Sequence, residues 1–293
     1  MEPDYVKLKE IKPALSGFIR TSRALLKRSE LPDEKAIHDV RVLMKKSRAL
    51  VKLTISQQDN IYFDRNISSL KEVGTIMCSW RETSVQRKLL KSFQRKYPDI
   101  FFQLRENSRL THLLEKNEPV TGSPEELKIA LEKIDDLLSK TNYRVRFQSM
   151  KSADPQLLLK ELDKSFTMIK DIYLLCRNNP KPALMHKFRK KAKDFLYQLV
   201  IFRPLNPPVV KALEKKLDSL TQNLGKFNDL TQIIKALGYS YREGSNMAAM
   251  DELAVKFREA QDKHLSKVWP AAYHVFCPGQ KLVNILGFKL LVI

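Results

Sequence analysis

The sequence repeats itself, and this repeat constrains the fold more than any other feature. One copy of the first motif begins at Ile37 and reads IHDVRVLMKKSRAL, and the other begins at Met185 and reads MHKFRKKAKDFLYQL. Their histidines, His38 and His186, stand 148 positions apart. A second motif reads MCSWRETSV in the first half and LGKFNDLTQ in the second, 147 positions later. Chance similarity between helices would not preserve the distance between two motifs, so we predict a duplication with two related halves.

Helix-forming residues dominate both halves, and glycine is scarce, with 8 residues in 293. Apolar residues recur at three- and four-residue steps, which is typical of amphipathic helices. We therefore predict an all-α fold of two helical bundles, about four helices each, related by a pseudo-twofold axis. Within a single domain spanning residues 1–293, the predicted boundaries are 1–145 and 150–270 for the two repeats and 271–293 for an apolar C-terminal tail.

The helix boundaries follow from proline, glycine and capping residues. Pro32 and Asp33 are expected to restart the chain after the first helix, and Gly74 to break the third. A basic connector, NYRVRFQSMKSAD, is expected between the halves. The tail could pack on the domain or be exposed. The predicted helical ranges are 5–29, 34–55, 58–95, a stretch that ends near 115, 125–139, 155–177, 183–202, 207–238 and 247–268.

Net charge indicates the kind of partner. The chain has 53 lysines and arginines against 33 acidic residues, which gives +20. Such an excess opposes compaction by self-repulsion and favours association with anions. Solubility alone is the alternative explanation, but it requires only a modest net charge. We therefore expect a polyanionic ligand, whose identity the charge does not specify.

The remaining composition indicates a cytoplasmic protein. The three cysteines, Cys78, Cys176 and Cys277, are far apart and form no CxxC pair, as expected of buried thiols in a reducing compartment. The charged N-terminus lacks the apolar core of a secretory signal. No stretch approaches the roughly 20 apolar residues of a membrane span.

The first copy of the motif places cations along one face of a helix. At about 100° per residue, His38, Arg41, Lys45 and Arg48 fall within one quadrant. In the second copy the corresponding face carries His186, Arg189, Lys190, Lys193 and Tyr197, and apolar residues occupy the opposite side of both helices. Like charges at this spacing repel each other, and a multivalent anion would relieve that repulsion. A solvated basic face is the alternative.

At these residues the chain resembles the CHAD domain, the conserved histidine α-helical domain. The patterns HxxRxxxKxxR and HxxRKxxKxxxY resemble its two signature helices, and the segments around Arg81-Glu82 and LGKFNDL resemble its second signature. The resemblance covers about residues 5–270. It implies two four-helix bundles around a basic central channel, with inorganic polyphosphate as the ligand, and in many members an association with polyphosphate granules.

The resemblance also implies a set of ligand contacts. Three positions depart from the family pattern: Leu196 replaces a common arginine, Ala49 stands opposite the second copy's tyrosine, and Cys78 replaces the usual glycine. The implied polyphosphate-binding residues are His38, Arg41, Lys45, Arg48, Arg81, His186, Arg189, Lys190, Lys193, Tyr197 and Asn228. Glu82 and Asp229 could orient arginines or form ordinary ion pairs, and the two histidines could contact the ligand or bridge helices.

No sequence motif indicates catalysis. A Gly-rich phosphate loop, an HExxH pattern and an acidic metal cluster are all missing, so no cofactor, metal or catalytic residue is predicted. The expected function is non-catalytic binding of polyphosphate by a monomer, with other polyanions as further candidate ligands. The alternative is a nucleic-acid-binding or scaffold protein that uses the same cations, although only Tyr197 is interleaved with them as base stacking would require. An enzyme that acts on phosphoanhydrides is a third reading.

Overall fold

The protein is helical throughout the part of the chain that the computed structural model describes: residues 11–28, 32–115, 123–147, 154–238 and 246–287, without the side chains of Ser79, Arg81, Glu82, Thr83, Ser84 and Pro124. The first half holds α1 (Ile11–Leu26), α2 (Glu34–Leu53), the 3₁₀ helix η2 (Ile55–Gln57), α3 (Asn60–Ile76), α4 (Ser79–Lys96), α5 (Pro98–Gln103), α6 (Ser108–Glu115) and α7 (Pro124–Phe147). The second half holds α8 (Pro155–Asn178), α9 (Pro182–Leu199), the 3₁₀ helix η3 (Val200–Phe202), α10 (Pro207–Leu237), α11 (Met247–Phe276) and α12 (Leu282–Leu286). These elements confirm the predicted all-α class.

Capping residues begin the helices where the sequence indicates. The carboxylate of Asp33 accepts a hydrogen bond from the backbone N–H of Ala36 at 2.6 Å and so satisfies one free donor of α2. Asp154 caps α8 in the same way, through the N–H of Gln156. The predicted break in the third helix is confirmed, but it falls just after Gly74, between the end of α3 and the start of α4.

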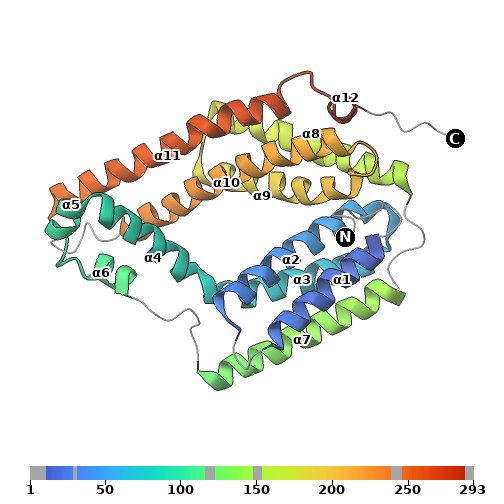
Figure 1. Ribbon diagram of the computed structural model, residues 1–293, viewed down its shortest axis with the longest axis horizontal. Coiled ribbons are helices and arrows are strands. Elements are labelled where there is room, and N and C mark those ends of the chain that lie inside the picture. Colours follow the sequence, from blue (N-terminus) through green and yellow to red (C-terminus); the bar gives the residue numbers. More distant parts are fainter. Residues whose placement is uncertain (1–10, 29–31, 116–122, 148–153, 239–245, 288–293) are drawn as a thin grey trace.

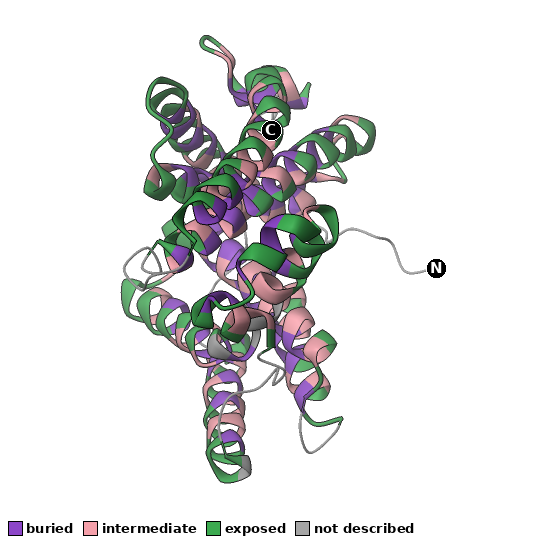
Figure 2. Ribbon diagram, turned by 90° about the vertical axis from the view of Figure 1, so that its left-hand side faces the viewer, coloured by how far each residue is buried: buried purple, intermediate pink, exposed green. Residues whose placement is uncertain are grey.

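Two hydrophobic cores lie mostly in separate halves of the chain. Helices α1, α2, α3 and α7 enclose one core, whose fully buried members include Leu15, Val40, Leu70 and Ile134. Helices α8 to α12 enclose the other, which also receives three side chains from α1 and α2 and includes Phe166, Phe188, Leu220 and Phe276. Figure 1 shows these two groups of helices one above the other, with α2 and α9 between them. Figure 2 shows the buried residues on the inward faces of the helices.

A third core, which the repeat did not predict, joins the two halves. Helix α4 leads away from the first group to α5 and α6, and these pack against the C-terminal part of α10 and the N-terminal part of α11 (Figure 1). The ring of Phe93 on α4 lies 4.6 Å from that of Phe257 on α11, centroid to centroid. The C-terminal part of α4, beyond the second motif, therefore packs against helices of the second half.

Two helices are longer than predicted. Helix α7 continues to Phe147, so the first part of the expected connector is helical. The reason is cross-helix bonding: Arg144 donates to Asn66 at 2.9 Å and to Ser69 at 2.9 Å, and Val145 is fully buried. The rest of the connector, from residue 148 to 153, lies outside the described residues.

Helix α11 runs to Phe276, past Pro270, so the region expected as a tail begins as helix. The short helix α12 then packs on the second core through Leu282 and Leu286. Asn206 donates to the carbonyl oxygen of Leu286 at 2.8 Å and fixes this segment against the start of α10. Residues 288–293 lie outside the description. Across the described helices, none has both the length and the apolarity needed to cross a membrane.

Candidate functional site

A cleft of about 290 Å³ lies where the two halves meet. Helix α2 packs against α9, and α9 packs along α10, so the signature segments of both halves converge there (Figure 1). The cleft is lined by Arg41, Lys45, Cys78, Val85, Gln86, His186, Arg189, Asn228, Asp229 and Gln232. Among these residues are three permanent cations, one histidine and a single carboxylate.

Arg41 is tied to the junction between α3 and α4. Its Nη1 donates to the carbonyl oxygen of Met77 at 2.7 Å and more weakly to that of Gly74 at 3.4 Å. Its Nη2 lies 3.9 Å from the sulfur of Cys78. Gly74 lies in the last turn of α3 and Met77 is its C-cap residue, and at a helix end backbone acceptors lack helical partners. The Nε–H of Arg41 is buried and has no acceptor among the described residues.

Arg189 makes neither a hydrogen bond nor an ion pair with any described residue, although its Nε–H is buried. Its guanidinium lies against Gly225 on α10: a Cβ added at that glycine would sit 3.2 Å from both Nε and Nη2. Such a distance is tighter than an ordinary contact. Gly225 therefore allows the guanidinium to approach the α10 backbone closely.

The two arginines occupy equivalent positions in the repeat but different surroundings. The position that Gly225 takes in the second half is taken by Cys78 in the first. The edge of the Arg189 guanidinium that carries Nε and Nη2 faces the glycine, whereas Arg41 reaches past the cysteine to carbonyls at the end of α3. The departure from the family pattern at Cys78 therefore coincides with a differently bonded arginine.

His186 bridges α9 and α10. Its Nδ1 lies 3.0 Å from Oδ1 of Asn228, and because that oxygen can only accept, the contact places the proton on Nδ1. The ring is exposed and lines the cleft. Its Nε2 is therefore the nitrogen left for a ligand, and the histidine fulfils the expected bridging role without leaving the cleft.

The stripe on α9 continues beyond the cleft. Lys193 forms an ion pair with Asp218 at 3.0 Å and lies 5.3 Å above the ring of Tyr197. Burial, with a smaller effect of Asp218, raises the pKa of Tyr197 to about 12. Lys190 is exposed on the same helix. Lys190, Lys193 and Tyr197 all lie outside the cleft lining.

On α2, Arg48 and His38 also lie outside the cleft lining. Arg48 is half-buried beside Gly74, and burial lowers the pKa of its guanidinium, with Asp194 opposing and Arg41 adding to that effect. The predicted contact at Arg81 falls on a side chain outside the described residues, as does Glu82.

The structure thus brings together five of the predicted ligand contacts: Arg41, Lys45, His186, Arg189 and Asn228. Sequence reasoning assigned no ligand role to Val85, Gln86 or Gln232 in the lining. The second motif already contained two of these, because Val85 and Gln232 are the last residues of its two copies, at the offset of 147 positions. Nothing in the motifs indicated Gln86.

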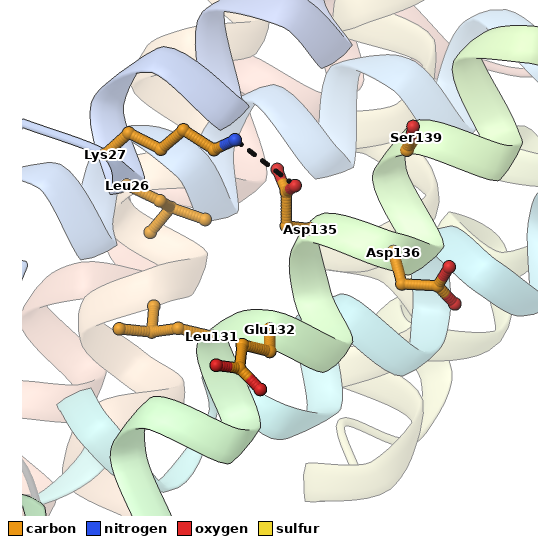
Figure 3. A pocket seen from close by; sticks show the side chains of 7 residues that line it. All are labelled: Leu26, Lys27, Leu131, Glu132, Asp135, Asp136 and Ser139. Carbon is orange, nitrogen blue, oxygen red and sulfur yellow. Dashed lines mark ion pairs between the residues drawn. The ribbon is translucent and has the colours of Figure 1, made fainter.

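A larger cleft, of about 500 Å³, lies between α1 and α7 and carries the opposite charge. Figure 3 shows its carboxylates, Glu132, Asp135 and Asp136, with Lys27 reaching toward Asp135. Arg23 donates to both oxygens of Asp135, at 2.7 and 2.9 Å, and this hydrogen bonding lowers the pKa of the aspartate. Such a lining repels polyanions. Nowhere in the described ranges do three or more His, Cys, Asp or Glu side chains group as metal ligands do.

Fold and site together define a class: an all-α protein in which cations from two repeated halves converge on one cleft. The chain matches the profile of the CHAD domain over residues 19–237 and therefore belongs to the CHAD-domain family. A search of curated protein sequences found no match.

Solved structures share the fold at low sequence identity. PptA from Streptomyces chartreusis is 13% identical, with a TM-score of 0.60, and the alignment covers 89% of this chain and 98% of that one. The CHAD domain from the plant Ricinus communis is 16% identical, with a TM-score of 0.57, over 97% of this chain and 93% of that one.

Proposed function

We propose that the cleft binds inorganic polyphosphate without turning it over. One observation carries this proposal: two guanidinium Nε–H groups, of Arg41 and Arg189, are buried without an acceptor among the described residues, and both arginines line the same cleft. Leaving a buried donor unsatisfied costs about 1–3 kcal/mol, and more for a charged group. A phosphate oxygen beside each arginine would recover this free energy.

The source of the cations favours a chain of phosphates over a single one. Arg41 and Lys45 come from α2, while His186 and Arg189 come from α9, so one ligand must span two helices to reach all of them. A linear polyanion can do so because it repeats its charge along its length. Some members of the CHAD-domain family bind polyphosphate, which supports this choice.

The lining also separates polyphosphate from single-stranded nucleic acid. Proteins that bind single strands stack bases on aromatic side chains. The described cleft lining contains no Phe, Tyr or Trp, and Tyr197, the one tyrosine on the stripe, lies outside it. The lining offers charge without a stacking surface, as a ligand without bases requires.

The test is a titration with long polyphosphate, orthophosphate and single-stranded DNA at several salt concentrations. Long polyphosphate should bind most tightly, and log K should fall steeply with log salt as counterions are released, by analogy with nucleic acids. Replacing Arg189 by Ala should weaken binding by about 1.5–3 kcal/mol, the value of a charged hydrogen bond. Lys215→Ala, which removes an exposed cation from α10, is the matched control.

Three results would contradict the proposal. Equal affinity for orthophosphate and long chains would show that the ligand does not need to reach both α2 and α9. Equal losses from Arg189→Ala and Lys215→Ala would mean diffuse charge rather than a site. Release of orthophosphate from bound chains would show turnover. In cells, a fluorescent fusion should gather on polyphosphate granules and disperse when both cleft arginines are replaced.

A further inference from the structure

A smaller cavity, of about 210 Å³, lies on the other side of α9 from the cleft. At about 100° per residue, its α9 residues sit roughly 80–180° around the helix from His186. Helix α8 closes it, and α2 contributes one lysine. The lining consists of Lys52, Glu161, Lys164, Ser165, Met168, Ile169, Lys191, Asp194, Phe195 and Gln198.

Gln198 presents an unsatisfied acceptor to this cavity. The side chain is 2% exposed, and its Nε2 donates to the carbonyl oxygen of Ala49 at 3.1 Å. That bond fixes the orientation of the amide, because the carbonyl can only accept. The opposite atom, Oε1, is buried and has no partner among the described residues. A ligand that donates a hydrogen bond would satisfy it.

Lys191 lines the same cavity and is half-buried. Its ammonium makes no hydrogen bond or ion pair with any described residue. Burial, and then the charge of Lys52, lowers its pKa, with Asp194 acting in the opposite direction. An anion beside Lys191 would further stabilise the charged form of this lysine.

The other charged groups limit the net charge of the site. Lys52 is paired with Asp194, and Lys164 with Glu161 at 2.7 Å. Three lysines against two carboxylates leave one positive charge, which belongs to Lys191. The cavity therefore suits one small anion. At about 210 Å³ it is below the range of roughly 300–1,000 Å³ that larger organic ligands occupy.

We infer that this cavity binds free orthophosphate, as a second site separate from the cleft. At neutral pH orthophosphate keeps at least one P–OH group. That hydroxyl donates to Oε1 of Gln198, and the charged oxygens accept from Lys191. Sulfate has a similar shape but carries no proton at neutral pH. It cannot satisfy Gln198, so the cavity discriminates between the two anions.

The experiment measures orthophosphate binding by calorimetry and ³¹P NMR in the Arg41→Ala, Arg189→Ala double variant, in which the cleft is disabled. Orthophosphate should still bind, and sulfate should bind at least about tenfold more weakly, the value of one lost hydrogen bond to a charged group. Lys191→Gln should weaken binding by about tenfold or more. The charge-matched control is Lys187→Gln, on the same helix but outside the cavity lining.

Gln198→Met should abolish the preference for phosphate over sulfate. Because Gln198 is buried, the result for Gln198→Met counts only if the melting curve of this variant is unchanged. If Gln198→Met is unstable, Lys191→Gln provides the test. Equal binding of sulfate, equal effects of the two lysine variants, or no orthophosphate binding in the double variant would each overturn the inference. Displacement of orthophosphate by equimolar pyrophosphate would assign the cavity to a chain end instead of the free anion.

Discussion

Replacing Gly225 by Ala should separate ligand binding from stability. The glycine lies in the interior of α10, where it is buried against the guanidinium of Arg189. An added Cβ would meet Nε and Nη2 of that arginine at 3.2 Å and Cζ at 3.6 Å. The guanidinium must therefore move by a few tenths of an ångström, while the α10 backbone accepts alanine without strain.

The two consequences have different signs. Alanine in a helix interior is favoured over glycine by about 0.8–1.0 kcal/mol. A displaced arginine side chain costs about 0.5–1.5 kcal/mol in rotamer strain. The free energy of unfolding should therefore change by less than about 1 kcal/mol. Binding of polyphosphate should weaken by about tenfold, short of the full loss of the charged hydrogen bond in Arg189→Ala.

The assay pairs a polyphosphate titration with chemical denaturation for each variant. Two other glycines provide graded controls. A Cβ at Gly17, in α1, would meet nothing within 4 Å, and a Cβ at Gly74 would meet Nη1 of Arg48 at an ordinary 3.6 Å. Neither alanine variant should change the affinity.

Wild-type affinity in Gly225→Ala, together with lost affinity in Arg189→Ala, would refute this prediction. That outcome would mean that the guanidinium can leave Gly225 without cost to the site. A loss of affinity in Gly17→Ala as large as that in Gly225→Ala would point instead to a general effect of helix stiffening.

Three further predictions follow from the same contacts. Arg41→Ala should lower the free energy of unfolding by about 1–3 kcal/mol, since it leaves the carbonyls of Met77 and Gly74 without their donor. Arg189→Ala should not lower it, because this change removes a buried Nε–H that has no acceptor among the described residues; denaturation curves compare the two variants. In a Cys277→Ser background, maleimide should label exposed Cys78 and block polyphosphate binding, and bound polyphosphate should protect this thiol. Burial raises the pKa of Cys176 to about 11, so Cys176 should stay unlabelled; mass spectrometry locates the label. Burial raises the pKa of Tyr197 to about 12, so on raising the pH the unfolded chain loses this proton first, near pH 10. The free energy of unfolding should therefore fall as pH rises between about 10 and 12, and Tyr197→Phe should lose this part of the pH dependence.

The sequence predicted the helices well because local signals determine where helices start. Asp33 and Asp154 are good N-caps, and each begins a helix within a residue or two of the expected position. Helix ends were less predictable. The end of α7 depends on Arg144 bonding to α3, a contact between residues far apart in sequence that no local pattern reveals.

The candidate site was predictable in part for a similar reason. Periodicity places Arg41, Lys45 and Arg189 on the correct helix faces, and the structure places all three in one cleft. Periodicity does not indicate where along a helix the cleft ends. Lys193 lies on the same face as Arg189, but it pairs with Asp218 of α10 and lies outside the cleft lining.

Arg41 and Arg189 stand at equivalent positions of the sequence repeat but differ in their hydrogen bonding. Arg41 is held by backbone carbonyls, so little side-chain entropy remains to be lost when an anion arrives. Arg189 has no partner among the described residues and a buried Nε–H, so it gains more from each hydrogen bond but must be ordered to form it. If the cleft binds a polyanion as proposed, the tethered guanidinium should fix where the ligand lies, and the unpartnered one should contribute more of the binding free energy. Exchange of Gly225 for the cysteine found at the equivalent position 78 would push Arg189 off α10, and the affinity of the cleft should fall accordingly.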